Sequence, residues 1–218
     1  MTTLILVRHG QTDSNIRNLL HGQSDVPLTP LGVAQAHAAA ARLGQERDIV
    51  AIYTSPLERA RHTAEIIGGV VGLTPIPHPG LMEVHFGDVE GLTWEEAIIR
   101  FPHLHIPGDE DGSADLLWPN GESRYGFRDR IQRALTEILS LHAGQKIVVA
   151  THGGVIGRGV GTLLGDASNS LNRHLVGNCA ISQLTWERAG EPPTLICHDD
   201  RSHLAVLEGT SGVVTTPV

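Results

Sequence analysis

The sequence lacks the features that mark nucleic-acid-binding or membrane-spanning proteins. Lysine and arginine together number 16, against 24 aspartate and glutamate residues, which gives a formal net charge of −8 at pH 7. Nucleic acids and anionic membrane surfaces both attract a cationic protein surface, so neither is expected as the main partner. No apolar stretch approaches the roughly 18 consecutive residues that a transmembrane helix needs, so we expect no membrane span.

The sequence contains only two cysteines and no recognisable nucleotide-binding motif. Cys179 and Cys197 have no Cys-x-x-Cys spacing, which disfavours a zinc site or a disulfide framework, and we expect buried, reduced thiols. A P-loop does not occur, and Gly-Arg-Gly-Val-Gly at 157–161 fails the Gly-x-Gly-x-x-Gly spacing, so nucleotide-driven chemistry is disfavoured. The first apolar run lacks the basic start and cleavage site of a signal peptide, so a cytoplasmic location is expected.

What the chain does contain is an alternation of apolar, strand-like runs with helical patterns. Its 218 residues, 40% of them apolar, are enough to bury a sizeable core in one domain. This order predicts an α/β fold, a three-layer sandwich in which helices flank a mostly parallel central sheet. We expect a single domain over residues 1–207. The predicted strands lie at 4–8, 49–54, 74–77, 146–151, 179–186 and 194–198.

Two helices have well-defined start signals. Thr29 is a good N-cap, a proline occupies the first helical position, and the alanine-rich run that follows ends at a glycine. Directly after the second strand, Ser55 offers an N-cap and Glu58 the glutamate of a capping box. A second helix is therefore predicted from this serine to the glycine pair at 68–69.

Residues 91–121 interrupt the regular patterns. Prolines and the acidic run at 108–112 break any long element there. Long irregular segments in compact domains are usually functional covers, so we expect an inserted lid at about 91–121. Trp94 and Trp118 flank this segment and are expected to pack it down, with contact to an apolar part of a substrate as the alternative. The last residues, 208–218, have no periodicity, and we expect a flexible tail.

Two of the predicted strands end in a histidine. The first strand leads into Arg8, His9 and a glycine, and the strand at 146–151 leads into His152 and a glycine pair. In open α/β sheets ligands bind at the carboxyl ends of the strands. The pattern therefore predicts that Arg8, His9 and His152 face one crevice.

Two further residues complete a set suited to phosphoryl transfer without a metal. Arg59 lies in the first turn of the second predicted helix, where free N–H groups already favour an anion, and Glu83 follows a turn. A neutral imidazole can attack phosphorus, while guanidinium groups bind the equatorial oxygens and stay charged. A carboxylic acid can then protonate the departing oxygen, and Glu83 is the candidate for that role.

Four motifs follow one another along the chain. They are Leu-Val-Arg-His-Gly-Gln-Thr-x-x-Asn at 6–15, Ser-Pro-Leu-x-Arg-Ala at 55–60, Leu-x-Glu-x-x-Phe-Gly-x-x-Glu-Gly at 81–91 and Thr-His-Gly-Gly at 151–154. Together they resemble the histidine phosphatase superfamily, in its phosphoglycerate mutase-like branch, over about residues 4–205. The resemblance implies the fold of that branch. Residues 119–123, Pro-Asn-Gly-Glu-Ser, also resemble a family turn that opens a helix.

The resemblance also implies roles for individual residues. His9 corresponds to the phosphorylated nucleophile and Glu83 to the general acid. Neither a metal nor another cofactor is implied. Groups that bind the phosphoryl group or the substrate are implied at Arg8, Asn15, Arg59, His152 and Gly153, and pocket-lining positions at Thr12, His21 and Gly22.

Departures from the mutase pattern favour a phosphatase. Ser14 stands where the resemblance places a tryptophan in mutases, and the basic stretch after the acid is replaced by residues 84–90. We therefore expect a metal-independent phosphomonoesterase acting on a small phosphorylated metabolite, such as a sugar phosphate or a phosphoglycerate derivative. Two alternatives remain open: phosphoryl transfer between hydroxyls, as in a phosphoglycerate mutase, and a catalytically silent binding module. Since relatives often form dimers, a homodimer is a further expectation.

Overall fold

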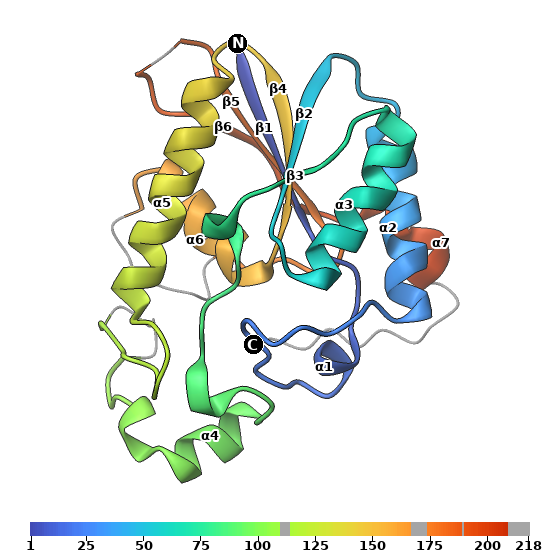
Figure 1. Ribbon diagram of the computed structural model, residues 1–218. Coiled ribbons are helices and arrows are strands. Elements are labelled where there is room, and N and C mark those ends of the chain that lie inside the picture. Colours follow the sequence, from blue (N-terminus) through green and yellow to red (C-terminus); the bar gives the residue numbers. More distant parts are fainter. Residues whose placement is uncertain (110–113, 167–173, 189, 209–218) are drawn as a thin grey trace.

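A central sheet with helices on both sides organises the molecule (Figure 1). The computed structural model describes residues 1–109, 114–166, 174–188 and 190–208. The sheet has the order β3-β2-β4-β1-β5-β6. Its first four members pair in parallel, whereas β5 runs antiparallel to both β1 and β6, so the predicted, mostly parallel sheet is confirmed. The strands are β1 (Thr2–Arg8), β2 (Ile49–Thr54), β3 (Ile76–Pro77), β4 (Lys146–Thr151), β5 (Ile181–Trp186) and β6 (Thr194–Asp200).

Alternate residues of the strands face two different hydrophobic cores. Leu4 and Leu6 of β1 pack in one cluster with residues of α5 and α6, whereas Ile5 and Val7 pack in the other with residues of α2 and α3. The three-layer α/β sandwich predicted from the sequence is therefore confirmed. No helix in the described ranges is long and apolar enough to cross a bilayer. The helices are α1 (Asp13–Ile16), α2 (Pro30–Leu43), α3 (Glu58–Val71), α4 (Trp94–Arg100), α5 (Arg124–Leu141), α6 (Gly153–Leu163) and α7 (Ala205–Glu208), with 3-10 turns at Pro79–Leu81, Gly87–Val89, Pro102–Leu104 and Ser202–Leu204.

Of the two helices predicted from start signals, the first begins where the sequence indicates and the second does not. Helix α2 begins as expected, with the Thr29 hydroxyl accepting a hydrogen bond from Gly32 N at 3.0 Å. Helix α3 instead begins at Glu58 and continues past the glycine pair to Gly72, whose φ of 76° ends it. The prediction that Ser55 caps this helix is wrong, because its N-cap is Leu57 and the N–H of its first residue, Glu58, donates to Asp25 Oδ1 at 2.7 Å.

The segment at 91–121 is more regular than its composition predicted. It contains α4, which begins with a capping box between Thr93 and Glu96. Leu104 and Trp118 are buried in the core cluster that includes α5, and the Trp118 ring packs edge-on against Trp94 at 6.1 Å between centroids. Trp118 thus packs this segment down as expected, whereas Trp94 is 37% exposed and touches Trp118 through this ring contact. Residues 110–113 of the expected lid, and 209–218 of the expected tail, lie outside the described residues.

Candidate active site

The carboxyl ends of β1 and β4 bring two histidines together. The strands are adjacent and parallel, with Arg8 of β1 in register with Thr151 of β4. His9 and His152 follow directly, and their ring centroids lie 5.3 Å apart. The His9 backbone N–H also donates to Thr151 O at 2.8 Å, which continues the ladder to the point where the rings meet. Two residues 143 positions apart therefore share one site because the register of two strands places them there.

His9 is held as a neutral imidazole, and one of its nitrogens has no partner among the described residues. Its side chain is 2% exposed, and Nδ1 lies 2.7 Å from Gly10 O. A carbonyl oxygen only accepts, so Nδ1 carries the hydrogen and Nε2 carries a lone pair. Burial, together with the charges of Arg59 and Arg8, lowers the pKa of His9 well below 6.5. The ring is therefore unprotonated at neutral pH, with the Nε2 lone pair in the form that nucleophilic attack requires.

His152 presents the opposite nitrogen to the site. Its Nε2 lies 2.8 Å from Ser55 Oγ, which also accepts a hydrogen bond from Leu57 N at 3.3 Å. The serine hydroxyl can therefore donate its proton to Nε2, which leaves the hydrogen of a neutral ring on Nδ1. Burial and the charge of Arg59 lower the pKa of His152 well below 6.5. Nδ1 is buried and has no partner among the described residues, so it is a donor available to a ligand.

Two guanidinium groups are each partly anchored and partly free. Arg59 is fully buried, and its Nη1 and Nη2 donate to Ser24 O at 2.9 Å and to Gly22 O at 2.6 Å. Arg8 donates through Nη1 to Val176 O at 2.6 Å. Burial lowers the pKa of Arg59 to about 10, a shift that the charge of Glu83 opposes, so the group stays cationic at neutral pH. The Nε atoms of both arginines are buried without a partner in the described part of the chain.

The Glu83 carboxyl lies at the start of α6, beside the second histidine. Its Oε1 accepts from Val84 N and its Oε2 from Gly154 N, each at 3.0 Å. The glycine pair that begins α6 permits this close approach. A Cβ at Gly154 would lie 2.5 Å from Glu83 Oε1, and one at Gly153 would lie 3.3 Å from Arg8 Nε. The site therefore combines the neutral His9 imidazole, two guanidinium cations, the neutral N–H donor of the second histidine and the Glu83 carboxyl group.

The matching family profile, histidine phosphatase superfamily (branch 1), spans residues 4–197. This chain belongs to the histidine phosphatase superfamily. A relative from Yersinia enterocolitica, named "Probable phosphoglycerate mutase GpmB", is 36% identical over 194 residues, which cover 87% of each chain.

Solved structures of superfamily members share the whole fold. The phosphoserine phosphatase of Entamoeba histolytica, solved as a mutant with phosphoserine, is 31% identical with a TM-score of 0.78, covering 94% of this chain and 100% of that one. A mycobacterial glucosyl-3-phosphoglycerate phosphatase, solved with VO3, is 29% identical with a TM-score of 0.76, covering 89% of this chain and 97% of that one. The superfamily therefore contains both phosphatase-named and mutase-named relatives of this protein.

The turn after β1 places two further residues that the superfamily resemblance singled out. The Thr12 hydroxyl accepts from Asn15 N at 3.3 Å and donates to Asn15 Oδ1 at 3.0 Å, so it caps α1. Asn15 Oδ1 also accepts from Asn178 Nδ2 at 3.1 Å. Because this oxygen is occupied, the Nδ2 group is the part of Asn15 that can donate to a ligand.

His21 and Gly22 close another side of the site. The His21 ring meets the His9 ring edge-on, with centroids 6.1 Å apart. Its Nδ1 lies 3.1 Å from Leu19 O and therefore carries the hydrogen, whereas Nε2 is buried without a partner in the described ranges. Burial and the charge of Arg59 lower the pKa of His21 to about 4. Gly22 contributes its carbonyl to Arg59, as described above.

Sequence reasoning missed the residues that support this site. Ser55 resembled a helix cap, although its hydroxyl contacts His152. Asn178 donates to His9 O at 3.1 Å as well as to Asn15, and no motif pointed to it. Glu90 accepts from Gln23 N at 2.9 Å and so holds the loop that Arg59 grips. The only signal for Glu90 in the sequence was its place as the second-last residue of the 81–91 motif. Among the described residues, no group of three or more histidine, cysteine or acidic side chains is arranged as metal ligands.

Proposed function

We propose that this protein is a phosphatase that hydrolyses the phosphate monoester of a small metabolite through a phosphohistidine at His9. One observation carries the proposal: four buried polar atoms around this ring have no partner among the described residues. Buried polar groups are normally hydrogen-bonded, so a cluster of unpaired ones calls for a ligand. Most of them are donors, and a phosphoryl group is their natural complement. The atoms are Arg8 Nε, His21 Nε2, Arg59 Nε and His152 Nδ1.

The first half of the reaction transfers the phosphoryl group to the enzyme. His9 Nε2 attacks phosphorus and the bond to the ester oxygen breaks, while Arg8 and Arg59 balance the charge on the equatorial oxygens. The Glu83 carboxylic acid gives its proton to the departing oxygen, so the product leaves as an alcohol. Because Gly154 N and Val84 N hold this carboxyl, the donor stays aligned with the leaving group.

The second half returns the phosphoryl group to water. The Glu83 carboxylate accepts a proton from a water molecule while the oxygen of that water attacks phosphorus, and the bond from phosphorus to His9 Nε2 breaks. Inorganic phosphate is released, and both residues regain their starting forms. The phosphatase names of the Entamoeba and mycobacterial relatives support hydrolysis, as does Ser14 at a position where mutases are expected to carry tryptophan. The substrate class we propose is a sugar phosphate or a phosphoglycerate derivative.

A mutase activity is the second candidate, and the name of the Yersinia relative favours it. The two activities differ only in whether water or a hydroxyl receives the phosphoryl group. Incubation with 3-phosphoglycerate, with and without a bisphosphorylated primer, separates them by comparing free phosphate with isomer formed. Release of phosphate faster than isomerisation supports the phosphatase, and the reverse would replace it with the mutase.

The phosphohistidine is tested by His9→Ala. We expect this variant to lose turnover of 4-nitrophenyl phosphate by several orders of magnitude, because no other group replaces the nucleophile. Wild-type protein quenched in alkali during turnover should carry an acid-labile phosphate on His9. His37→Ala, which removes an exposed histidine on α2, is the matched control and should keep full activity. Undiminished turnover in His9→Ala would refute the mechanism, and phosphate binding without turnover in wild type would identify a silent binding module.

A further inference from the structure

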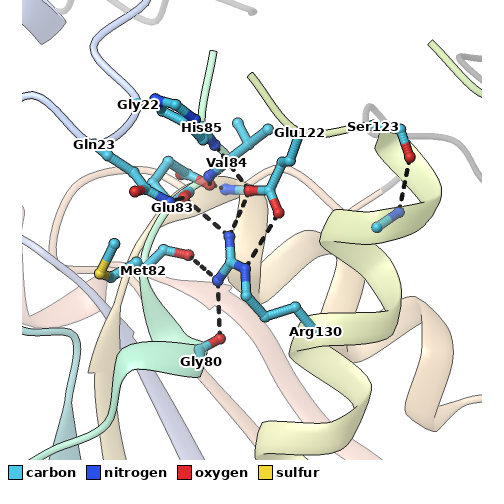
Figure 2. Close-up of polar contacts among 12 residues, drawn as sticks. Gly22, Gln23, Gly80, Met82, Glu83, Val84, His85, Glu122, Ser123 and Arg130 are labelled. Carbon is cyan, nitrogen blue, oxygen red and sulfur yellow. Dashed lines mark hydrogen bonds and ion pairs between the residues drawn. The ribbon is translucent and has the colours of Figure 1, made fainter. Parts of the chain in front are cut away.

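An arginine on α5 grips the backbone of the segment that carries Glu83 (Figure 2). Arg130 Nη1 donates to Gly80 O at 3.1 Å and to Met82 O at 2.8 Å. Its Nη2 donates to Glu83 O at 3.1 Å. One guanidinium group therefore holds three carbonyls within four consecutive residues.

Glu122, just before α5, completes this grip from the other side (Figure 2). Its Oε1 accepts from Arg130 Nη2 at 2.6 Å and its Oε2 from Arg130 Nε at 3.2 Å, which makes a two-pronged ion pair. The same Oε1 accepts from His85 N at 2.8 Å. Both side chains are about four-fifths buried, at 21% and 20% exposed. The pair thus binds the chain before and after Glu83.

The backbone around Glu83 has no regular structure of its own. Residues 82–86 lie between two 3-10 turns, outside any helix or strand. Gln23 Nε2 also donates to Glu83 O, at 3.1 Å, but Gln23 belongs to a loop. Arg130, by contrast, lies within α5, and its guanidinium also lies 5.2 Å from the centre of the Phe127 ring. The helix is the rigid element to which the segment is tied.

We propose that Arg130 and Glu122 form a positioning pair for the Glu83 proton donor. The inference rests on the proposed function, because it concerns the alignment of the general acid. The negative charge of Glu122 offsets the positive charge of the Arg130 guanidinium, so the pair adds no net charge near Glu83. Its effect on Glu83 comes instead from fixing the position of the backbone. Neither residue touches the reacting atoms in this scheme. A carboxyl displaced by about 1 Å from its leaving group loses much of its catalytic effect.

Leaving-group dependence distinguishes positioning of the acid from a merely structural role. 4-Nitrophenyl phosphate releases a stable phenolate and needs little proton donation, whereas phenyl phosphate has the same shape and a more basic leaving group. The quantity to measure is the ratio of kcat/KM for the nitrophenyl ester to that for the phenyl ester. Partial unfolding lowers kcat/KM for the two esters by the same factor, so it leaves this ratio unchanged.

We expect Arg130→Ala to raise the ratio by about tenfold, and Glu83→Gln to raise it at least as much. Arg130→Lys keeps the charge but loses the planar fork, so it should fall between wild type and alanine. Glu122→Gln keeps an oxygen for His85 N and is a milder second variant in case Arg130→Ala folds poorly. Arg133→Ala, which removes an exposed arginine of the same helix, should keep the wild-type ratio.

Combining Arg130→Ala with Glu83→Gln tests whether the two act together. If the arginine works through the acid, the double variant has the ratio of Glu83→Gln alone. Wild-type ratios in Arg130→Ala and Glu122→Gln, with a raised ratio in Glu83→Gln, would refute the positioning role and leave the proposed function standing. A wild-type ratio in Glu83→Gln would refute the acid itself, and the positioning role with it.

Discussion

Alanine at Gly154 should separate stability from activity. This glycine lies in the first turn of α6, and its N–H donates to Glu83 Oε2 at 3.0 Å. An added Cβ would lie 2.5 Å from Glu83 Oε1 and 3.3 Å from Oε2. A non-bonded carbon and oxygen lie about 3.3 Å apart or more, so the carboxyl has to withdraw by roughly 0.8 Å.

Stability and activity are expected to respond differently to this substitution. The end of a glutamate side chain can move at little cost, and alanine is favoured over glycine in a helix by about 0.5–1 kcal/mol. Withdrawal of the carboxyl also weakens its hydrogen bond to Gly154 N, which costs about 0.5–1.5 kcal/mol and offsets that gain. Gly154→Ala should therefore keep a melting temperature close to that of the wild type. A displacement approaching 1 Å at the acid can lower the rate by about 10²-fold, so kcat/KM for phenyl phosphate should fall by up to that factor.

The assay compares kcat/KM for phenyl and 4-nitrophenyl phosphate with melting temperatures measured on the same samples. Gly69→Ala is the matched control, because Gly69 is a glycine of α3 whose added Cβ would meet no atom within 4 Å. It should gain the helix stability and keep full activity. A Gly154→Ala variant that keeps wild-type rates on both esters would show that the alignment of this carboxyl does not matter for the chemistry.

Two further predictions concern the buried histidines. Because burial and Arg59 hold the pKa of His21 at about 4, the unfolded chain with its ordinary pKa of 6.5 binds the proton first, and stability should fall as pH decreases below 6.5. His21 accounts for about 2 kcal/mol of that loss by pH 5. The free energy of unfolding of His21→Asn, measured by denaturation at each pH, should therefore decline less steeply below pH 6.5 than that of the wild type. Equal slopes for the two proteins would contradict the assigned pKa shift. Ser55→Ala removes the partner of His152 Nε2, so it should lower the free energy of unfolding by about 1–3 kcal/mol and reduce kcat/KM; an unchanged urea midpoint would contradict it.

The strands and the histidines that follow them could be predicted because their signals are local. A buried parallel strand is a continuous apolar run, and the residue after it must reach the edge of the sheet. The runs before His9 and His152 satisfy both conditions, so their meeting required only that β1 and β4 be neighbours. The sequence could not supply that adjacency, since strand order depends on how the helices cover the sheet.

Ser55 shows how a local signal can be overridden. Serine followed by proline and glutamate is a good start for a helix, yet the Ser55 hydroxyl contacts His152, which lies 97 residues further along the chain. The Ser55 oxygen still accepts from Leu57 N, but the N–H of Glu58, the first residue of the helix, donates to the carboxylate of Asp25 from a distant loop. The regular helix starts at Glu58, three residues after Ser55.

The sequence by itself determined the α/β class and the identities of the residues at the strand ends, because both follow from the order of apolar runs and short motifs. Only the tertiary structure decided the supporting contacts. Arg130 sits in an ordinary helical stretch, where arginine is usually solvated, and its role depends on carbonyls about fifty residues away in sequence. Every residue has a backbone carbonyl, so the sequence does not indicate which carbonyls a side chain will bind. Hydrogen bonds to them can be identified only in the folded structure.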